Sequence, residues 1–356
     1  MGLIYFAVLF LTSIQTIEAQ TPSAASATQP KFKAIWEPVP FTKDVELKSI
    51  SCIGPETCWV GGQKSTILYT ADGGKTWQVQ MGGDPEGTEE DILEIFFFDA
   101  KHGWALTARS RLMGTTDGSS WTELGNPHTV ARGLWFSSPQ TGFVNDSQGR
   151  KRTDDGGKSW KNVGPCSVDT MIGGLPRKLT CDMHVTTFVS PTAGYMGGGA
   201  LLAPGAQAAA IGRTTDGGST WSISVIPDTK SRVIGLHFWS GTSGIARLDS
   251  GQVFWTGDGG TTWTGTPSPP RWRSFYGSGE GKIIAAIHRE GDQIAYSFNG
   301  GRNFTSRAFT IPAGVRDVTF FDATHGYFVG QHGMAYRYRI VPIDYTSPGM
   351  IGAMAP

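Results

Sequence analysis

The chain has 356 residues, of which 49 are glycine, and only 17% are charged. Lys plus Arg and Asp plus Glu both number 30, so the formal charge is zero, which argues against a nucleic-acid partner and an acidic disordered tail. Apolar residues at 39% can fill a core, and a glycine share about twice the usual one predicts short strands and tight turns rather than helices.

The N-terminus has the features of an export signal. Leu3–Ile14 is an apolar run too short to cross a bilayer as a helix, and the small-residue exit Ile17–Ala19 follows it. We predict a signal peptide at residues 1–19, then a flexible linker at residues 20–33, and hence a periplasmic or extracellular protein. No Lys or Arg precedes the run, so an uncleaved anchor is the alternative. No Cys follows it, which disfavours a lipoprotein anchor.

The four cysteines fit an oxidising compartment. Cys52 and Cys58 flank a short bend, and Cys166 and Cys181 bracket a loop that contains Gly and Pro. We predict the disulfides Cys52–Cys58 and Cys166–Cys181. A zinc site would need short paired spacings such as C-x2-C, which the sequence lacks. We therefore expect no metal and no cofactor.

One phrase recurs along most of the chain, in the form TADGGKTW at Thr70–Trp77 and TDDGGKSW at Thr153–Trp160. This is the Asp-box, and its six copies include two weaker ones. The Asp should accept hydrogen bonds from backbone N–H groups of its own turn, and the Gly residues should take positive φ. We assign the boxes a structural role, since six equivalent catalytic acids make no chemical sense. The key residues are Asp72, Trp77, Asp117, Trp121, Asp155, Trp160, Asp216, Trp221, Asp258, Trp263, Asn299 and Phe304.

A second phrase precedes each box and reads as strand, turn, strand, as in FFDAKHGWAL from Phe97. Seven copies begin at Cys52, Phe97, Phe136, Phe188, Phe238, Phe275 and Phe320. Phrase and box together predict four antiparallel strands per repeat, which is typical of a propeller blade. We expect an all-β, seven-bladed β-propeller at residues 34–341, with the last blade closed by the N-terminal strand Ala34–Pro40. Residues 342–356 would be a loose C-terminal tail.

The start of each innermost strand is the candidate binding position. Four residues before each phrase, five of the seven positions are basic, and Leu93 and Ile234 occupy the other two. The basic ones are Lys48, Arg132, His184, Arg271 and Arg316. A basic collar on a neutral protein predicts an anionic ligand or an acidic partner surface. The alternative is that these residues only bond neighbouring blades.

The fourth repeat is longer than its neighbours. The extra residues lie in Cys166–Cys181 and in the Ala-rich stretch Gly197–Ala210. They could form a docking element, or a long loop in solvent.

The phrases F-x-D-x-x-x-G-W and T-x-D-G-G-x-T-W resemble those of the photosystem II assembly and stability factor family, which has non-photosynthetic relatives. The resemblance covers the predicted propeller. It implies a non-enzymatic, monomeric scaffold that holds a protein partner, such as a membrane or envelope complex. Nothing in the sequence itself indicates photosynthesis.

The Asp-boxes also resemble those of sialidases, but the Arg-Ile-Pro type motif of that family is absent and seven repeats fit it poorly. The alternatives to a scaffold are therefore a propeller that binds carbohydrate or matrix, with a glycan as partner, or a sialidase-like glycoside hydrolase.

Overall fold

All the regular elements in the described part of the chain are β-strands, which confirms the all-β prediction. The computed structural model describes residues 32–127, 132–146, 149–163, 166–172, 174–267, 272–277, 284–288, 293–308, 314–321 and 325–342. The predicted signal peptide, the tail beyond Pro342 and the linker up to residue 31 lie outside these ranges. Strand β1 (Phe32–Pro38) begins two residues before the predicted start of the propeller, because Phe32 and Lys33 continue the strand.

The strands form seven sheets, in which consecutive strands pair as antiparallel neighbours. The first contains β2 (Leu47–Cys52), β3 (Cys58–Gly62), β4 (Ile67–Thr70) and β5 (Gln78–Met81). The second contains β6 (Ile92–Phe97), β7 (Gly103–Thr107), β8 (Leu112–Thr115) and β9 (Thr122–Gly125). The third contains β10 (Arg132–Phe136), β11 (Gly142–Asp146), β12 (Gly149–Thr153) and β13 (Lys161–Asn162). The fourth has five strands, β14 (Cys166–Ile172), β15 (Leu175–Phe188), β16 (Gly194–Ala203), β17 (Ala206–Thr214) and β18 (Ser222–Val225).

The last three sheets complete the order. The fifth contains β19 (Val233–Phe238), β20 (Gly244–Leu248), β21 (Val253–Thr256) and β22 (Thr264–Gly265). The sixth contains β23 (Trp272–Gly277), β24 (Ile284–His288), β25 (Gln293–Ser297) and β26 (Thr305–Ala308). The seventh has the order β1-β29-β28-β27, with β27 (Val315–Phe320), β28 (His325–Gly330) and β29 (Ala335–Pro342). A strand from each end of the chain therefore lies in one sheet.

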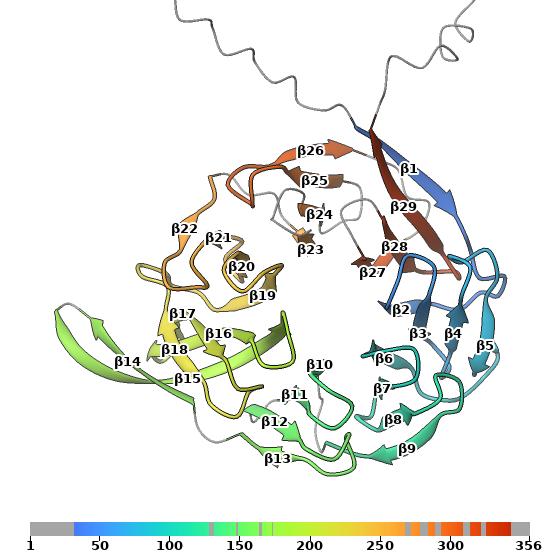
Figure 1. Ribbon diagram of the computed structural model, residues 1–356, viewed down its shortest axis with the longest axis horizontal. Coiled ribbons are helices and arrows are strands. Elements are labelled where there is room, and N and C mark those ends of the chain that lie inside the picture. The colour runs from blue at the N-terminus through green and yellow to red at the C-terminus, as the bar shows by residue number, and fades with distance from the viewer. Residues whose placement is uncertain are drawn as a thin grey trace, which may run out of the picture. The chain divides into compact units, whose positions relative to one another are not determined.

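Within the compact unit Lys33–Val341, the sheets are arranged around a common centre (Figure 1). Each innermost strand contacts the innermost strand of the next sheet, and β27 contacts β2. In the seventh sheet, the backbone N–H groups of Val39 and Phe41 donate to Ala335 and Gly333, both at 2.9 Å. The Trp77 indole donates to the Val39 carbonyl at 2.8 Å, which ties this sheet to the first. These contacts join the two ends of the compact unit within the seventh sheet and link that sheet to the first.

Aromatic rings from the strand–turn–strand phrase join neighbouring sheets. Trp59 stacks on Phe97 at 3.6 Å between ring centroids, and Trp104 stacks on Phe136 at 3.5 Å. The Trp104 indole also donates to the Gly156 carbonyl of the next Asp-box at 2.8 Å. Stacked rings gain attraction in addition to the area that they bury. The buried clusters accordingly span pairs of sheets, and the hydrophobic core lies in the layers between them.

The Asp-boxes form tight turns between the third and fourth strands. In the first box, Asp72 accepts from the Thr76 N–H at 2.9 Å and from the Thr70 hydroxyl at 2.8 Å, while the Gly74 N–H donates to the Thr70 hydroxyl at 2.8 Å. The same pattern recurs around Asp155, Asp216 and Asp258. Asn299 accepts the equivalent bond from the Asn303 N–H at 3.1 Å. These contacts agree with a structural role for the boxes.

The two extra stretches of the fourth repeat, for which a docking element and a long loop in solvent were both open, form regular strands in the fourth sheet. Residues 166–181 form a hairpin of β14 and β15, paired from Cys166 with Cys181 to Ile172 with Leu175. Strand-forming residues such as Val168, Thr170 and Ile172 favour this structure over a loop. The Ala-rich stretch likewise lengthens β16 and β17. Both predicted disulfides are present.

No helix in the described ranges is long and apolar enough to cross a membrane.

Candidate partner-binding site

The predicted collar positions share one backbone feature. In five sheets, the antiparallel register shifts at the collar residue, which lies in a β-bulge near the start of the innermost strand or, for His184, within the longer strand β15. The bulged residues are Lys48, Leu93, His184, Ile234 and Arg316. Arg132 lies on β10 opposite Asn145, at the edge of a similar shift, and Arg271 is outside the described residues. A bulge takes its extra residue out of the strand ladder and redirects the side chain.

Acidic partners neutralise the collar on one side of the ring. The Lys48 ammonium lies 2.7 Å from Asp91 and 3.4 Å from Glu46, and the Arg316 guanidinium bonds the same Glu46. These four residues form a continuous ion-pair network from the seventh sheet to the segment that enters the second. Lys48 and Arg316 therefore each have an acidic partner within the protein, and the binding role of the collar stays a prediction.

His184 does not add a positive charge at neutral pH. Its imidazole lies 3.3 Å from Asp182 and 3.3 Å from the Arg232 guanidinium. Burial lowers the pKa of His184 below its usual value, Asp182 opposes this effect, and Arg232 adds to it. Burial thus favours the neutral form of the His184 imidazole.

Neighbouring innermost strands are bonded by residues next to the collar. The Asp317 carboxylate accepts from the Ile50 N–H at 2.9 Å, where the seventh sheet meets the first. The Glu94 carboxylate accepts from the Gly133 and Leu134 N–H groups at 3.0 and 2.8 Å. Burial raises the pKa of Asp317 to about 6, although its hydrogen bonds act in the opposite direction. Acids one position beyond the collar therefore bond neighbouring innermost strands, in addition to the ion pairs that Lys48 and Arg316 form between sheets.

The sequence did contain a sign of these acidic partners. Glu46, Asp91 and Asp182 each stand two positions before a collar residue. Glu46 and Asp91 lie just before the innermost strands β2 and β6, where they reach Arg316 and Lys48 of the preceding sheet, and Asp182 lies beside His184 of its own strand. Sequence reasoning aligned only the collar position and so missed the pattern.

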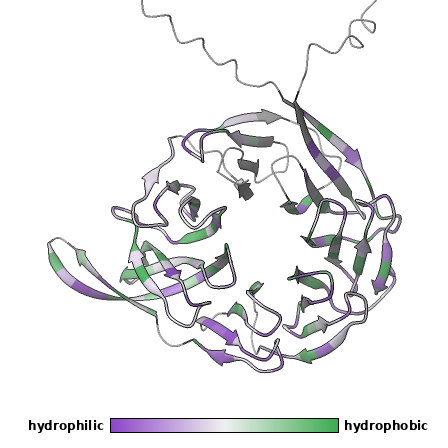
Figure 2. Ribbon diagram, in the orientation of Figure 1, coloured by the Kyte–Doolittle hydropathy of each residue, from purple (hydrophilic) through white to green (hydrophobic). Residues whose placement is uncertain are grey.

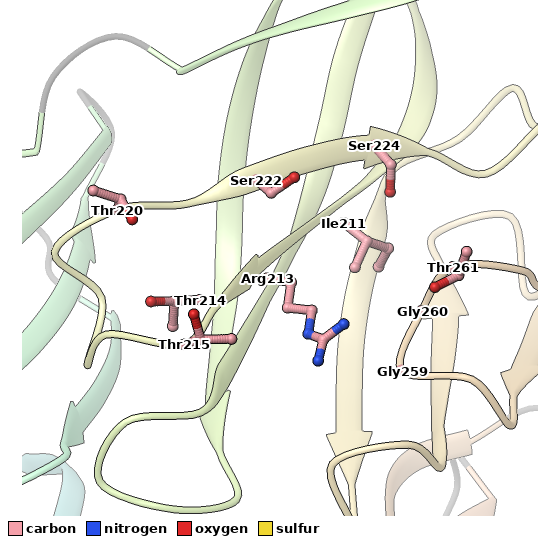
Figure 3. A pocket seen from close by; sticks show the side chains of 10 residues that line it. All are labelled: Ile211, Arg213, Thr214, Thr215, Thr220, Ser222, Ser224, Gly259, Gly260 and Thr261. Carbon is pink, nitrogen blue, oxygen red and sulfur yellow. The ribbon is translucent and has the colours of Figure 1, made fainter.

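A polar groove between the fourth and fifth sheets is a second candidate site. It encloses ≈ 530 Å³ and is lined by Arg213, by Thr and Ser hydroxyls and by the Asp-box residues Gly259–Thr261. Figure 3 shows the Arg213 side chain extending between β17 and the loop that carries Gly259. This lining offers one cation and several hydroxyl groups, which suits a carboxylate or a sugar. No carboxylate, His or Cys is among its lining residues, so it lacks the usual acid–base groups. The sequence analysis did not identify this groove.

The described residues hold no cluster of three or more His, Cys, Asp or Glu side chains that could bind a metal ion.

Comparisons with known proteins bear on the role of this ring. A family model described as photosynthesis system II assembly factor YCF48 matches residues 28–124. The photosystem II assembly protein Ycf48 of Synechococcus sp. (strain JA-2-3B'a(2-13)) is 25% identical over 335 residues, which cover 88% of this chain and 92% of the relative. The chain resembles the Ycf48 assembly factors.

A further Ycf48 relative, from Synechococcus sp. (strain CC9902), is named a photosystem II assembly lipoprotein and is 24% identical over 70% of this chain and 82% of its own length. Among solved structures, YCF48 bound to a D1 peptide aligns with a TM-score of 0.57 at 17% identity, over 86% of this chain and 96% of that one. An inactive virginiamycin B lyase from Staphylococcus aureus, with quinupristin, aligns with a TM-score of 0.52 at 14% identity, over 87% of this chain and all of that one. At these identities the likeness shows the fold alone, and the fold alone does not separate a scaffold from an enzyme.

Proposed function

We propose that this chain is an exported, non-enzymatic propeller scaffold that binds a protein partner and acts as an assembly or stability factor for a membrane or envelope complex. The observation that carries the proposal is the extent of the Ycf48 resemblance, which covers 88% of this chain and 92% of the relative. The whole ring, rather than a single repeat, corresponds to the assembly factor. A solved Ycf48 that holds a peptide supports a protein segment as ligand.

In this proposal each of the seven sheets is one blade, and β1 closes the seventh. The Asp-boxes fix the outer turns, and the two disulfides suit a periplasmic or extracellular location. The protein would act as a monomer, because closing the ring pairs the strand edges at its ends.

The partner would bind at the collar. The network of Arg316, Glu46, Lys48 and Asp91 is half-buried, and its ion pairs can be exchanged for charged groups of a bound segment at little net cost. Recognition there would use charges of both signs rather than a single basic surface. Arg132 and Arg271 would supply the remaining cations.

A glycan ligand is the alternative, and the Arg213 groove is the observation that favours it. The two candidate sites lie on different parts of the ring, so charge reversal at each one can be compared with the other.

The test is capture of partners from the native envelope with three baits that start at Gln20. These are the wild type, Arg132→Glu/Arg271→Glu, and the matched control Arg213→Glu. The proposal predicts one defined protein that the wild type and the control retain and the collar variant loses. If only Arg213→Glu loses the captured protein, the partner binds in the groove that Arg213 lines. If no bait retains a protein, a panel of glycans tests the alternative.

A further inference from the structure

The β14–β15 hairpin of the fourth sheet projects outward from the ring (Figure 1). Its end, residues 171–176, has the sequence MIGGLP and carries no charge. The Met171 side chain is 63% exposed and Leu175 is 58% exposed, the two highest values among the large apolar side chains of the described residues. Leu201 and Leu202, at the end of the neighbouring β16–β17 hairpin, are also exposed. Half of the exposed large apolar residues in the described part of the chain thus belong to this one sheet.

Cations follow directly behind the apolar end. In the backbone register, Arg177 lies opposite Thr170, and Lys178 lies opposite Asp169. These are the two residue pairs next to Met171 and Pro176, so this band carries two cations and one exposed carboxylate. Both basic side chains are exposed. Figure 2 shows the same order, with a hydrophobic end followed by a hydrophilic band. At about 3.3 Å per strand residue, the cations lie within about 10 Å of the end.

The hairpin is held firmly in place by its base. The Cys166–Cys181 disulfide joins the two strands there. Val168, Leu179 and Cys181 belong to a buried cluster with Met183 and Met196, and β14 contacts β18 across it. The fold therefore uses the base of the hairpin for packing and leaves its apolar end uncovered. A preorganised element loses little entropy when it docks.

We propose that the described side chains at the hairpin end, Met171, Leu175, Arg177 and Lys178, dock on the surface of a bilayer that contains anionic lipid. Apolar side chains at the end would enter the boundary between headgroups and acyl chains, while Arg177 and Lys178 would lie at the level of the lipid phosphates. A bilayer fits better than a protein pocket because the apolar residues form a narrow projection with cations at one depth behind it, rather than a broad patch. This inference goes beyond the proposed function, since it does not depend on the collar.

The test is sedimentation with lipid vesicles of phosphatidylcholine, with and without phosphatidylglycerol. The protein starts at Gln20, because this chain keeps the whole compact unit Lys33–Val341 and lacks the apolar run near the N-terminus. The variants are Met171→Asp/Leu175→Asp and Arg177→Glu/Lys178→Glu. Val79→Asp is the matched control, because Val79 is 46% exposed on the outer strand β5. Circular dichroism and mass measurement of the disulfides confirm that each variant is folded.

The expected result is that wild type and Val79→Asp bind the anionic vesicles equally, and that Met171→Asp/Leu175→Asp lowers the bound-to-free ratio at least about tenfold. Arg177→Glu/Lys178→Glu should weaken binding only where phosphatidylglycerol is present, and added salt should reduce this difference. The proposal is overturned if the wild type binds neither kind of vesicle, or if Met171→Asp/Leu175→Asp binds the vesicles as well as the wild type does. Loss of a captured protein in the Asp variant, without vesicle binding by the wild type, would assign the hairpin to a protein partner instead.

Discussion

At the scale of single residues, the glycine of the strand–turn–strand phrase is required by the ring that lies against it. A Cβ added at Gly103 would overlap the Phe97 ring of the same sheet. The Phe97 ring cannot move away, because it stacks on Trp59 of the preceding sheet. Gly142 and Gly194 are in the same position against Phe136 and Phe188. The phrase is thus a packing motif that connects neighbouring sheets.

We predict that Gly103→Ala lowers the free energy of unfolding by about 1–3 kcal/mol, because the new methyl group overpacks this contact. Gly241→Ala is the control, since a Cβ there would meet nothing within 4 Å. Equilibrium denaturation in urea measures both variants. Equal midpoints for the two would show that the aromatic stack tolerates the methyl group.

Asp317 gives a second prediction at this scale. Its pKa is raised to about 6 in the folded protein from an ordinary value of 3.8, so its contribution to stability is fully present below about pH 4 and is lost as pH rises through 6. A change of two pKa units corresponds to at most about 3 kcal/mol. Asp317→Asn should remove this part of the pH dependence, which denaturation at a series of pH values measures. An unchanged pH dependence in the variant would contradict the assignment.

At the scale of elements, β1 closes the ring through a few side chains. Trp36 lies 4.6 Å from Phe328 and 4.4 Å from Tyr338 between ring centroids, and Glu37 forms an ion pair with Arg339. We predict that Trp36→Ala lowers the free energy of unfolding by about 2–4 kcal/mol, since it removes these ring contacts. Lys33→Ala on the exposed part of β1 is the control and should change stability by less than about 0.5 kcal/mol. If both variants behave alike in thermal unfolding, closure by β1 contributes little.

The elements also show how far the sequence can be interpreted. The hydrogen bonds of an Asp-box lie within one turn, and the strands of a phrase are neighbours in the sequence, so the strand positions followed from local patterns. The ion pair between Glu46 and Arg316 joins residues 270 positions apart. Such a contact depends on which sheets are neighbours and on the bulges that turn the side chains, and a single sequence shows neither directly. The β14–β15 hairpin was mistaken for a loop because its Gly and Pro residues were given more weight than the strand-forming residues around them.

At the scale of the whole molecule, two groups of carboxylates set the pH range of stability. Hydrogen bonds from Thr and Ser residues of the turn lower the pKa of Asp72, Asp155 and Asp258 to about 2. The stabilisation of the folded state by these carboxylates is therefore present above about pH 4 and is lost as pH falls through 2. Asp317 acts in the opposite direction between pH 4 and 6. We predict that the melting temperature is highest near pH 4–5 and falls on both sides. A melting temperature that rises steadily to pH 8 would contradict this.

The central claim is that the ring is a scaffold whose partner binds where the innermost strands begin. Photo-crosslinking tests it most directly, with a benzoylphenylalanine placed at Leu93 or Ile234, two apolar bulge positions of the collar, or at Val79 on an outer strand as the control. The account predicts that both collar positions crosslink the same envelope protein and that Val79 does not. A partner that crosslinks from Val79 but from neither collar position would contradict it.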